Sequence, residues 1–153
     1  AAVERGGAFT AELETFAAIS PDAPELAALR SHAEKGVATR ADIVAETDEA
    51  ADAMIAAAKP VNPDAGIVER LVSSAESLVK VRPIGQVEGT GVPETVARME
   101  VAVNQGDFAK ALAEYETLPE AAKAAGAAFA AKLKARQDVE TLVDQIVAGA
   151  MKA

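Results

Sequence analysis

A glycine followed by an aspartate, at Gly106 and Asp107, constrains the fold of this chain more than any other pair of residues. Gly106 can adopt the left-handed backbone conformation that ends one helix, and Asp107 can cap the first turn of the next. Apolar residues then recur at helical spacing, at Phe108, Ala111, Leu112, Tyr115 and Leu118. The stretch therefore predicts a helical hairpin, and none of its residues predicts catalysis.

The composition of the chain favours helices throughout. Half of the 153 residues are apolar, alanine dominates that half, and only 3% of the residues are aromatic. Small side chains suit close-packed helices, whereas a β-sandwich needs β-branched and aromatic residues. We expect an all-α fold in which helical hairpins pack as a small bundle or a short tetratricopeptide-like stack. Three consecutive regions are expected: short helices in 1–60, an amphipathic helix with a Gly/Pro loop in 61–93, and a hairpin with a long C-terminal helix in 94–153.

Turn and capping residues predict the other helix boundaries. Residues 20–22 (Ser-Pro-Asp) are expected to close a first helix and to cap a second. Thr39 is predicted to cap a third helix, and Thr47 with Asp48 a fourth. Pro119 is predicted to begin a long last helix, in which Gly126 is the only weak point.

The charge of the chain excludes some classes of partner. The formal charge is −9, and residues 1–76 carry 14 acidic but only 6 basic side chains. This balance argues against nucleic acid as a partner and against the first half lying on an anionic membrane. It favours a solvated helical surface over a role in binding an acidic partner. The chain has no cysteine, no run of about 18 apolar residues and no visible signal peptide.

Residue types that carry chemistry are few or scattered. His32 is the only histidine, and one histidine can form neither a catalytic triad nor a zinc site. The carboxylates fall mainly on the polar sides of predicted helices. Gly85, Gly89 and Gly91 lack the preceding strand and the lysine of a phosphate-binding loop, so we interpret them as loop residues. We expect no enzymatic activity, no cofactor and no metal.

A basic cluster on the predicted last helix is an exception in an acidic chain. Its members are Lys123, Lys132, Lys134 and Arg136. An ordinary exposed helix face is the favoured interpretation. The alternative is a docking patch for lipid phosphates or an acidic partner.

The segment 66–81 is the most ambiguous element. Its apolar residues recur at i, i+3, i+4, i+7, i+10 and i+11, opposite a narrow face rich in serine, which predicts an amphipathic helix of about four turns. One interpretation packs the apolar side on the core or on another copy of the chain. The other places it on a membrane surface, although the segment has no Trp or Phe and a local charge of only about +1 when Arg82 is included. The candidate lipid- or partner-binding residues are Val68, Leu71, Val72, Leu78, Val79, Lys80 and Arg82.

Several motifs in one order give the chain a family resemblance. R-P-I-G-x-V-E-G is followed by A-R-M-E, G-D-F-A-K-A-L and L-P-E-A-A-K. This series resembles the C-terminal signature of the mitofilin-like proteins of alphaproteobacteria, which are relatives of the mitochondrial protein that organises crista junctions. The similarity is strongest over 81–142, and the upstream run P-E-L-A-A-L-R-S-H-A-E-K-G-V is also similar.

The resemblance implies a non-enzymatic scaffold that organises and shapes membranes. Members of that family have an N-terminal membrane anchor, a coiled coil, a lipid-binding helical segment and then the signature domain, with their bulk on the periplasmic side of the bacterial inner membrane. This chain lacks the anchor and the coiled coil. By position, 66–81 corresponds to the lipid-binding segment. The implied partners are a membrane lipid surface, further copies in a homo-oligomer and other envelope proteins. The alternative is a helical adaptor that binds protein partners without lipid contact.

Overall fold

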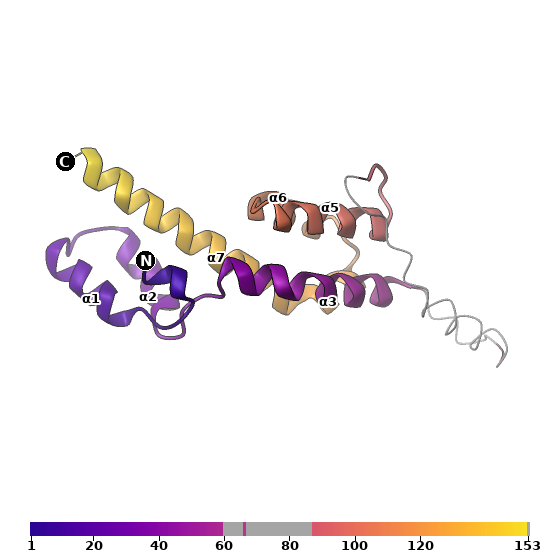
Figure 1. The fold of residues 1–153 in the computed structure, drawn as a ribbon, viewed down its shortest axis with the longest axis horizontal. Coiled ribbons are helices and arrows are strands. Elements are labelled where there is room, and N and C mark those ends of the chain that lie inside the picture. The colour runs from indigo at the N-terminus through magenta and orange to yellow at the C-terminus, as the bar shows by residue number, and fades with distance from the viewer. Residues whose placement is uncertain (60–65, 67–86, 153) are drawn as a thin grey trace. The chain divides into compact units, whose positions relative to one another are not determined.

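The expected all-α class is confirmed in a computed structural model, which describes residues 1–59, 66 and 87–152. Every regular element in these ranges is helical, and none is a strand (Figure 1). A single 3₁₀ turn, η1, precedes the α-helices. The elements are η1 (Val3–Arg5), α1 (Thr10–Ile19), α2 (Glu25–Ala33), α3 (Arg40–Ala58), α5 (Val92–Asn104), α6 (Phe108–Glu116) and α7 (Glu120–Lys152).

The helices form two compact units that are not consecutive in sequence. Unit 1 contains residues 1–45 and 129–153, and unit 2 contains residues 46–128. The boundaries fall inside α3 and α7, so each of these helices supplies residues to both units. The sequence-based division at residues 60 and 93 differs from this one, because the second half of α7 joins the core of the N-terminal helices.

Unit 1 is held together by an apolar cluster that recruits α7. Side chains of α7 and of the first 37 residues make up its buried part, namely Phe9, Leu13, Leu26, Leu29, Ala33, Val37 and Val139. Leu142, Val143 and Ile146 of α7 pack against this cluster and are partly buried. The N-terminal segments thus remove from water part of the apolar surface of α7, around residues 139–146.

The turn between α1 and α2 differs in detail from the prediction. The N–H of Ser20 donates to the carbonyl oxygen of Phe16 (2.9 Å) and closes α1 as expected. However, α2 begins at Glu25, and its N-cap Pro24 has no side-chain oxygen that could accept a hydrogen bond from the first turn. The prediction that residues 20–22 cap α2 is therefore wrong, although they do form the turn.

Residues 40–58 form one helix, so the predicted break at Thr47 and Asp48 is wrong. Thr39 caps α3 as predicted, because its Oγ1 accepts a hydrogen bond from the N–H of Asp42 (3.0 Å). The side chain of Asp42 returns the contact by accepting from the N–H of Thr39 (3.0 Å). The helix then continues because its buried residues follow one helical face, at Ile43, Thr47, Ala51 and Met54.

In unit 2 the predicted hairpin is confirmed. Gly106 has φ 75° and ends α5, and the Oδ1 of Asp107 accepts a hydrogen bond from the N–H of Lys110 (3.1 Å). The facing sides of α5 and α6 are buried, at Val96, Ala97, Met99, Ala102, Val103, Phe108, Ala111 and Tyr115. The two capping residues thus turn the chain where its two apolar faces can meet.

The last helix begins at Glu120, directly after Pro119, as the sequence predicts. The carbonyl oxygen of Pro119 accepts a hydrogen bond from the N–H of Lys123 (3.0 Å). Gly126 has a packing role that the sequence does not indicate. A Cβ at this position would lie only 2.8 Å from the Cγ of Met54 and 3.2 Å from the Cε2 of Tyr115. Glycine therefore lets α7 approach α3 and α6 within unit 2.

Candidate functional site

The residues predicted to bind lipid lie outside the described part of the chain. These are Val68, Leu71, Val72, Leu78, Val79, Lys80 and Arg82. Among the helices in the described ranges, none has the length and hydropathy needed to cross a bilayer.

The predicted basic cluster is not one exposed patch, because Arg136 is buried. Its side chain is 0% exposed, and it belongs to unit 1 with Lys132 and Lys134, whereas Lys123 belongs to unit 2. The Nζ of Lys123 lies 3.1 Å from Glu120, and the Nζ of Lys134 lies 3.0 Å from Asp138. The two carboxylates that flank the basic cluster in sequence, Glu120 and Asp138, thus pair with its outer lysines. The prediction that Arg136 lies on an exposed helix face is wrong.

Arg136 instead joins the start of the chain to α7. Its Nη1 donates to the carbonyl oxygen of Val3 (3.0 Å) and its Nη2 to Glu4 (2.7 Å). Its Nε donates to Glu140 (2.6 Å), one turn further along α7. The guanidinium therefore contacts a backbone oxygen and two carboxylates, which offsets the cost of burying its charge.

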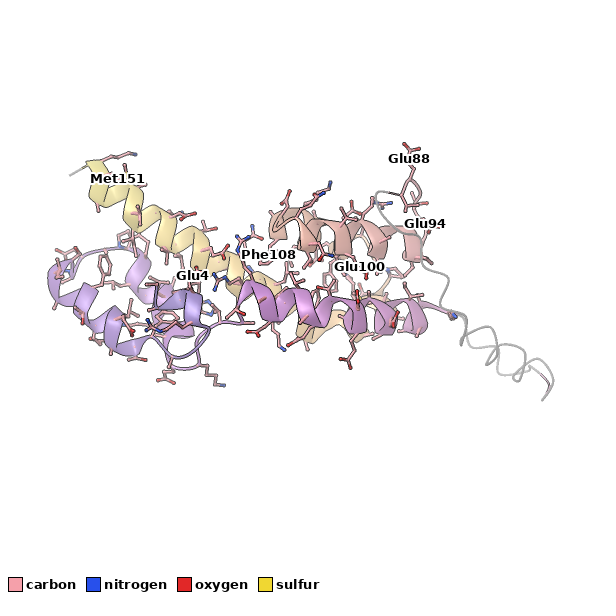
Figure 2. The ribbon with its side chains drawn as sticks, in the orientation of Figure 1. Glu4, Glu88, Glu94, Glu100, Phe108 and Met151 are labelled. Carbon is pink, nitrogen blue, oxygen red and sulfur yellow. The ribbon has the colours of Figure 1, made fainter. Side chains whose placement is uncertain are left out.

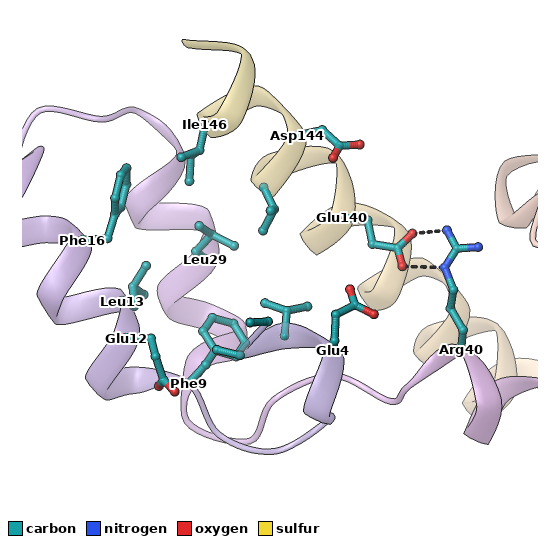
Figure 3. A pocket seen from close by; sticks show the side chains of 14 residues that line it. Glu4, Phe9, Glu12, Leu13, Phe16, Leu29, Arg40, Glu140, Asp144 and Ile146 are labelled. Carbon is teal, nitrogen blue, oxygen red and sulfur yellow. Dashed lines mark hydrogen bonds and ion pairs between the residues drawn. The ribbon is translucent and has the colours of Figure 1, made fainter. Parts of the chain in front are cut away.

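A second arginine binds the same glutamate. Arg40 donates from Nε (2.8 Å) and Nη2 (2.5 Å) to the two oxygens of Glu140, as the dashed lines in Figure 3 show. The hydrogen bond from Arg40, together with Arg136, holds the pKa of Glu140 below its usual value, against the opposing effect of burial. Because the folded-state pKa is lowered, this contribution to stability is present at neutral pH and is lost as the pH falls through that lowered value.

Beside this network unit 1 contains a groove of about 470 Å³ (Figure 3). Its walls are mainly apolar and its mouth carries charged groups. The apolar lining is Phe9, Leu13, Phe16, Leu29, Val143 and Ile146, with the alanines and valine of residues 1–3. The charged lining is Glu4, Glu12, Arg40, Glu140 and Asp144. This unit 1 groove has the size and lining of a binding site for an apolar group.

The charges at the groove are largely neutralised within the protein. Arg136 and Arg40 bind Glu4 and Glu140, and Arg5 donates to Glu12. The pKa of Glu12 is lowered by a hydrogen bond from its own backbone N–H and by Arg5. The lowered pKa values keep the carboxylates of Glu12 and Glu140 ionised at neutral pH, so neither is a proton donor there.

The described residues also show no gathering of metal ligands. Three His, Cys, Asp or Glu side chains in the arrangement of a metal site do not occur within them. His32 is partly buried on α2, away from the groove lining. Its interpretation as a surface or cap residue stays a prediction.

A second arginine cluster, in unit 2, connects a loop to the α5–α6 hairpin. Arg98 of α5 donates from Nη1 to the carbonyl oxygens of Val87 (2.9 Å) and Gly89 (2.7 Å). Its Nε lies 3.1 Å from both oxygens of Glu114 on α6, and its Nη2 donates to Thr95 (3.2 Å). Apart from its place within A-R-M-E, nothing in the sequence around Arg98 predicts these contacts.

The unit 1 groove was likewise missed, because its walls come from segments more than 100 residues apart in the sequence. The spacing of apolar residues predicts which face of a helix is buried, but not where two such faces leave a gap. No protein-family model, curated protein or solved structure matches this chain.

Proposed function

We propose that this chain is part of a non-enzymatic, mitofilin-like scaffold that organises membranes on the periplasmic side of a bacterial inner membrane. The segment 66–81 is the lipid-contacting element, and the protein acts as a homo-oligomer. The observation that carries the proposal is the amphipathic pattern of 66–81, directly before the signature motifs. The order and spacing of those motifs support the family.

In the proposed physical mechanism, many helices each bind the membrane weakly and insert only to a shallow depth. Each helix places its apolar stripe at the level of the lipid headgroups, which expands one leaflet and favours curvature. A single stripe without Trp or Phe binds weakly, but several copies in one oligomer bind with avidity. The α5–α6 hairpin and α7 provide the rigid support from which the segment is presented.

The low charge of the segment sets an expectation for lipid preference. With a local charge of about +1 over 66–82 in a chain of net charge −9, electrostatic attraction to anionic lipids is small. The apolar stripe must then supply most of the affinity. Binding to vesicles of zwitterionic lipid should therefore persist when the salt concentration is raised.

The test is flotation with small vesicles. Changing Leu71 and Val72 to Asp should reduce the floated fraction at least about tenfold, because two carboxylates in the stripe oppose insertion. The matched control changes Ser73 and Ser74 to Asp, which adds the same charge on the polar face and should leave flotation nearly unchanged. Equal flotation of the Leu71/Val72 variant and the wild type would remove this segment from the lipid role.

Thermal unfolding of the same variants separates lipid contact from core packing. If the stripe is packed inside the protein, the Leu71/Val72 variant will unfold at a much lower temperature than the Ser73/Ser74 variant. If the stripe contacts lipid, the two variants should unfold at similar temperatures in the absence of vesicles.

One observation favours a second function, that of an adaptor for protein partners. The unit 1 groove offers an apolar surface that a partner's side chains could fill. Changing Phe16 to Asp should then reduce capture of envelope proteins from an extract and leave vesicle flotation intact. Unchanged capture would remove the groove from such a role.

A further inference from the structure

Arg98 makes more contacts than an ordinary surface ion pair. Its side chain is 23% exposed and that of Glu114 19%, so both charges are largely shielded from water. Two of its hydrogen bonds go to carbonyl oxygens of the loop, at Val87 and Gly89, which lie before α5. One planar guanidinium thus fixes a loop, α5 and α6 to one another.

The loop between Val87 and α5 is packed closely against the helix that follows it. A Cβ on Gly89 would lie 3.2 Å from the Cγ of Glu94, and a Cβ on Gly91 would also clash with the Glu94 carboxylate. Gly89 has φ 131°, a conformation that favours glycine. Figure 2 labels Glu88 and Glu94, which mark this loop and the start of α5. Arg98 therefore holds the loop through its hydrogen bonds to Val87 and Gly89, and the Glu94 side chain lies close to Gly89 and Gly91.

This attachment shortens the chain that connects 66–81 to a rigid element. Residue 81 is six Cα–Cα steps before Val87, so the two Cα atoms lie at most about 20 Å apart. It is eleven steps before Val92, the start of α5, from which it can lie up to about 38 Å away. Attachment at Val87 therefore nearly halves the greatest distance between the end of 66–81 and a residue held on α5.

We infer that Arg98 is a positioning residue, which holds the exit of the membrane-contacting segment on the α5–α6 hairpin. This inference rests on the proposed function and adds a residue to it that does not touch lipid. A single apolar stripe can insert into a membrane whatever its orientation relative to the hairpin. Bending a membrane, however, requires many stripes that share one orientation. Arg98 therefore acts on bending more than on binding.

Lysine cannot replace arginine at this position. The two loop carbonyls and the Glu114 carboxylate lie around a planar fork of N–H donors, whereas an ammonium is a point charge with three donors. The Arg98→Lys variant keeps the charge but loses part of the attachment. Its behaviour should lie between those of the wild type and Arg98→Ala.

The test has one arm in solution and one on vesicles. In solution, the amides of residues 87–91 should exchange hydrogen at least about tenfold faster in Arg98→Ala than in the wild type, because two charged hydrogen bonds to the loop are lost. On vesicles, Arg98→Ala should float within about twofold of the wild type but form several-fold fewer tubules. Arg30→Ala, which removes an exposed arginine of unit 1, is the control and should change neither result.

A fold defect is distinguished from loss of positioning by a second variant. Arg98→Gln combined with Glu114→Gln removes both charges, so no buried carboxylate is left without a partner. It should retain the helical circular dichroism of the wild type and show the same loss of tubules as Arg98→Ala.

Three results would count against the inference in different ways. Unchanged exchange at 87–91 would overturn the attachment, and faster exchange with undiminished tubule formation would overturn its role in bending. A wild-type chain that does not float would overturn the proposed function and with it this role, while the exchange arm would still report on the attachment itself.

Discussion

Two arginines of unit 1, the buried Arg136 and the half-exposed Arg40, make polar contacts between segments that are far apart in sequence. Arg136 binds Val3 and Glu4, which precede it by 133 and 132 positions in the sequence. Arg40 binds Glu140, which follows it by 100 positions. A guanidinium suits this task because it can bond several oxygens in one plane and stays charged. Its basic neighbours in sequence, Lys132 and Lys134, stay exposed. The basic run itself does not indicate which member will be buried, because Val3 and Glu4, which also bind Arg136, lie more than 130 positions away in sequence.

Changing Arg136 to Met tests this structural role. The variant keeps most of the side-chain volume but loses the bonds to Val3, Glu4 and Glu140, so its free energy of unfolding should fall by about 2–4 kcal/mol. Lys134→Met removes only an exposed ion pair with Asp138 and should change stability by less than about 0.5 kcal/mol. Denaturant unfolding measures both, and equal stability of the two variants would refute the structural role.

At the scale of helices, the ends that depend on neighbouring residues could be predicted from the sequence, whereas the packing between helices could not. The α5–α6 corner follows from Gly106 and Asp107 because a left-handed glycine and a side-chain cap act within four residues. The same reasoning failed at Thr47, a good capping residue that is instead 1% exposed on the buried face of α3. Gly126 looked like a helix defect, whereas its lack of a side chain is what the neighbouring elements require.

Two glycines of α7 offer a matched test of that requirement. Alanine favours a helix over glycine by about 1 kcal/mol, so Gly149→Ala, with no atom within 4 Å of the new Cβ, should be neutral or slightly stabilising. Gly126→Ala gains the same propensity but forces Met54 and Tyr115 apart, so we expect a net loss of about 1–3 kcal/mol. Thermal unfolding of the two variants decides, and stabilisation by both would contradict the close packing at Gly126.

At the scale of the whole molecule, each unit is assembled from segments distant in sequence. Pro119 predicted where α7 begins, but nothing in the sequence predicted that the second half of this helix would complete the core around Phe9 and Leu29. The unit 1 groove could not be predicted for the same reason. Exposed apolar side chains remain near the helix ends of unit 1, at Ile19 (77%) and Met151 (83%), the latter labelled in Figure 2.

The central claim is that the stripe of 66–81 enters a membrane, and tryptophan fluorescence tests it most directly. The chain has no tryptophan and one tyrosine, so a single Leu71→Trp variant reports on that position alone. Ile19→Trp, at an exposed site on α1, is the matched control.

We predict that vesicles shift the emission of Trp at position 71 to shorter wavelength and expose it to a lipid-borne quencher, since an indole prefers the headgroup level. The emission of Trp at position 19 should stay unchanged. Emission at position 71 that is the same with and without vesicles would contradict the account.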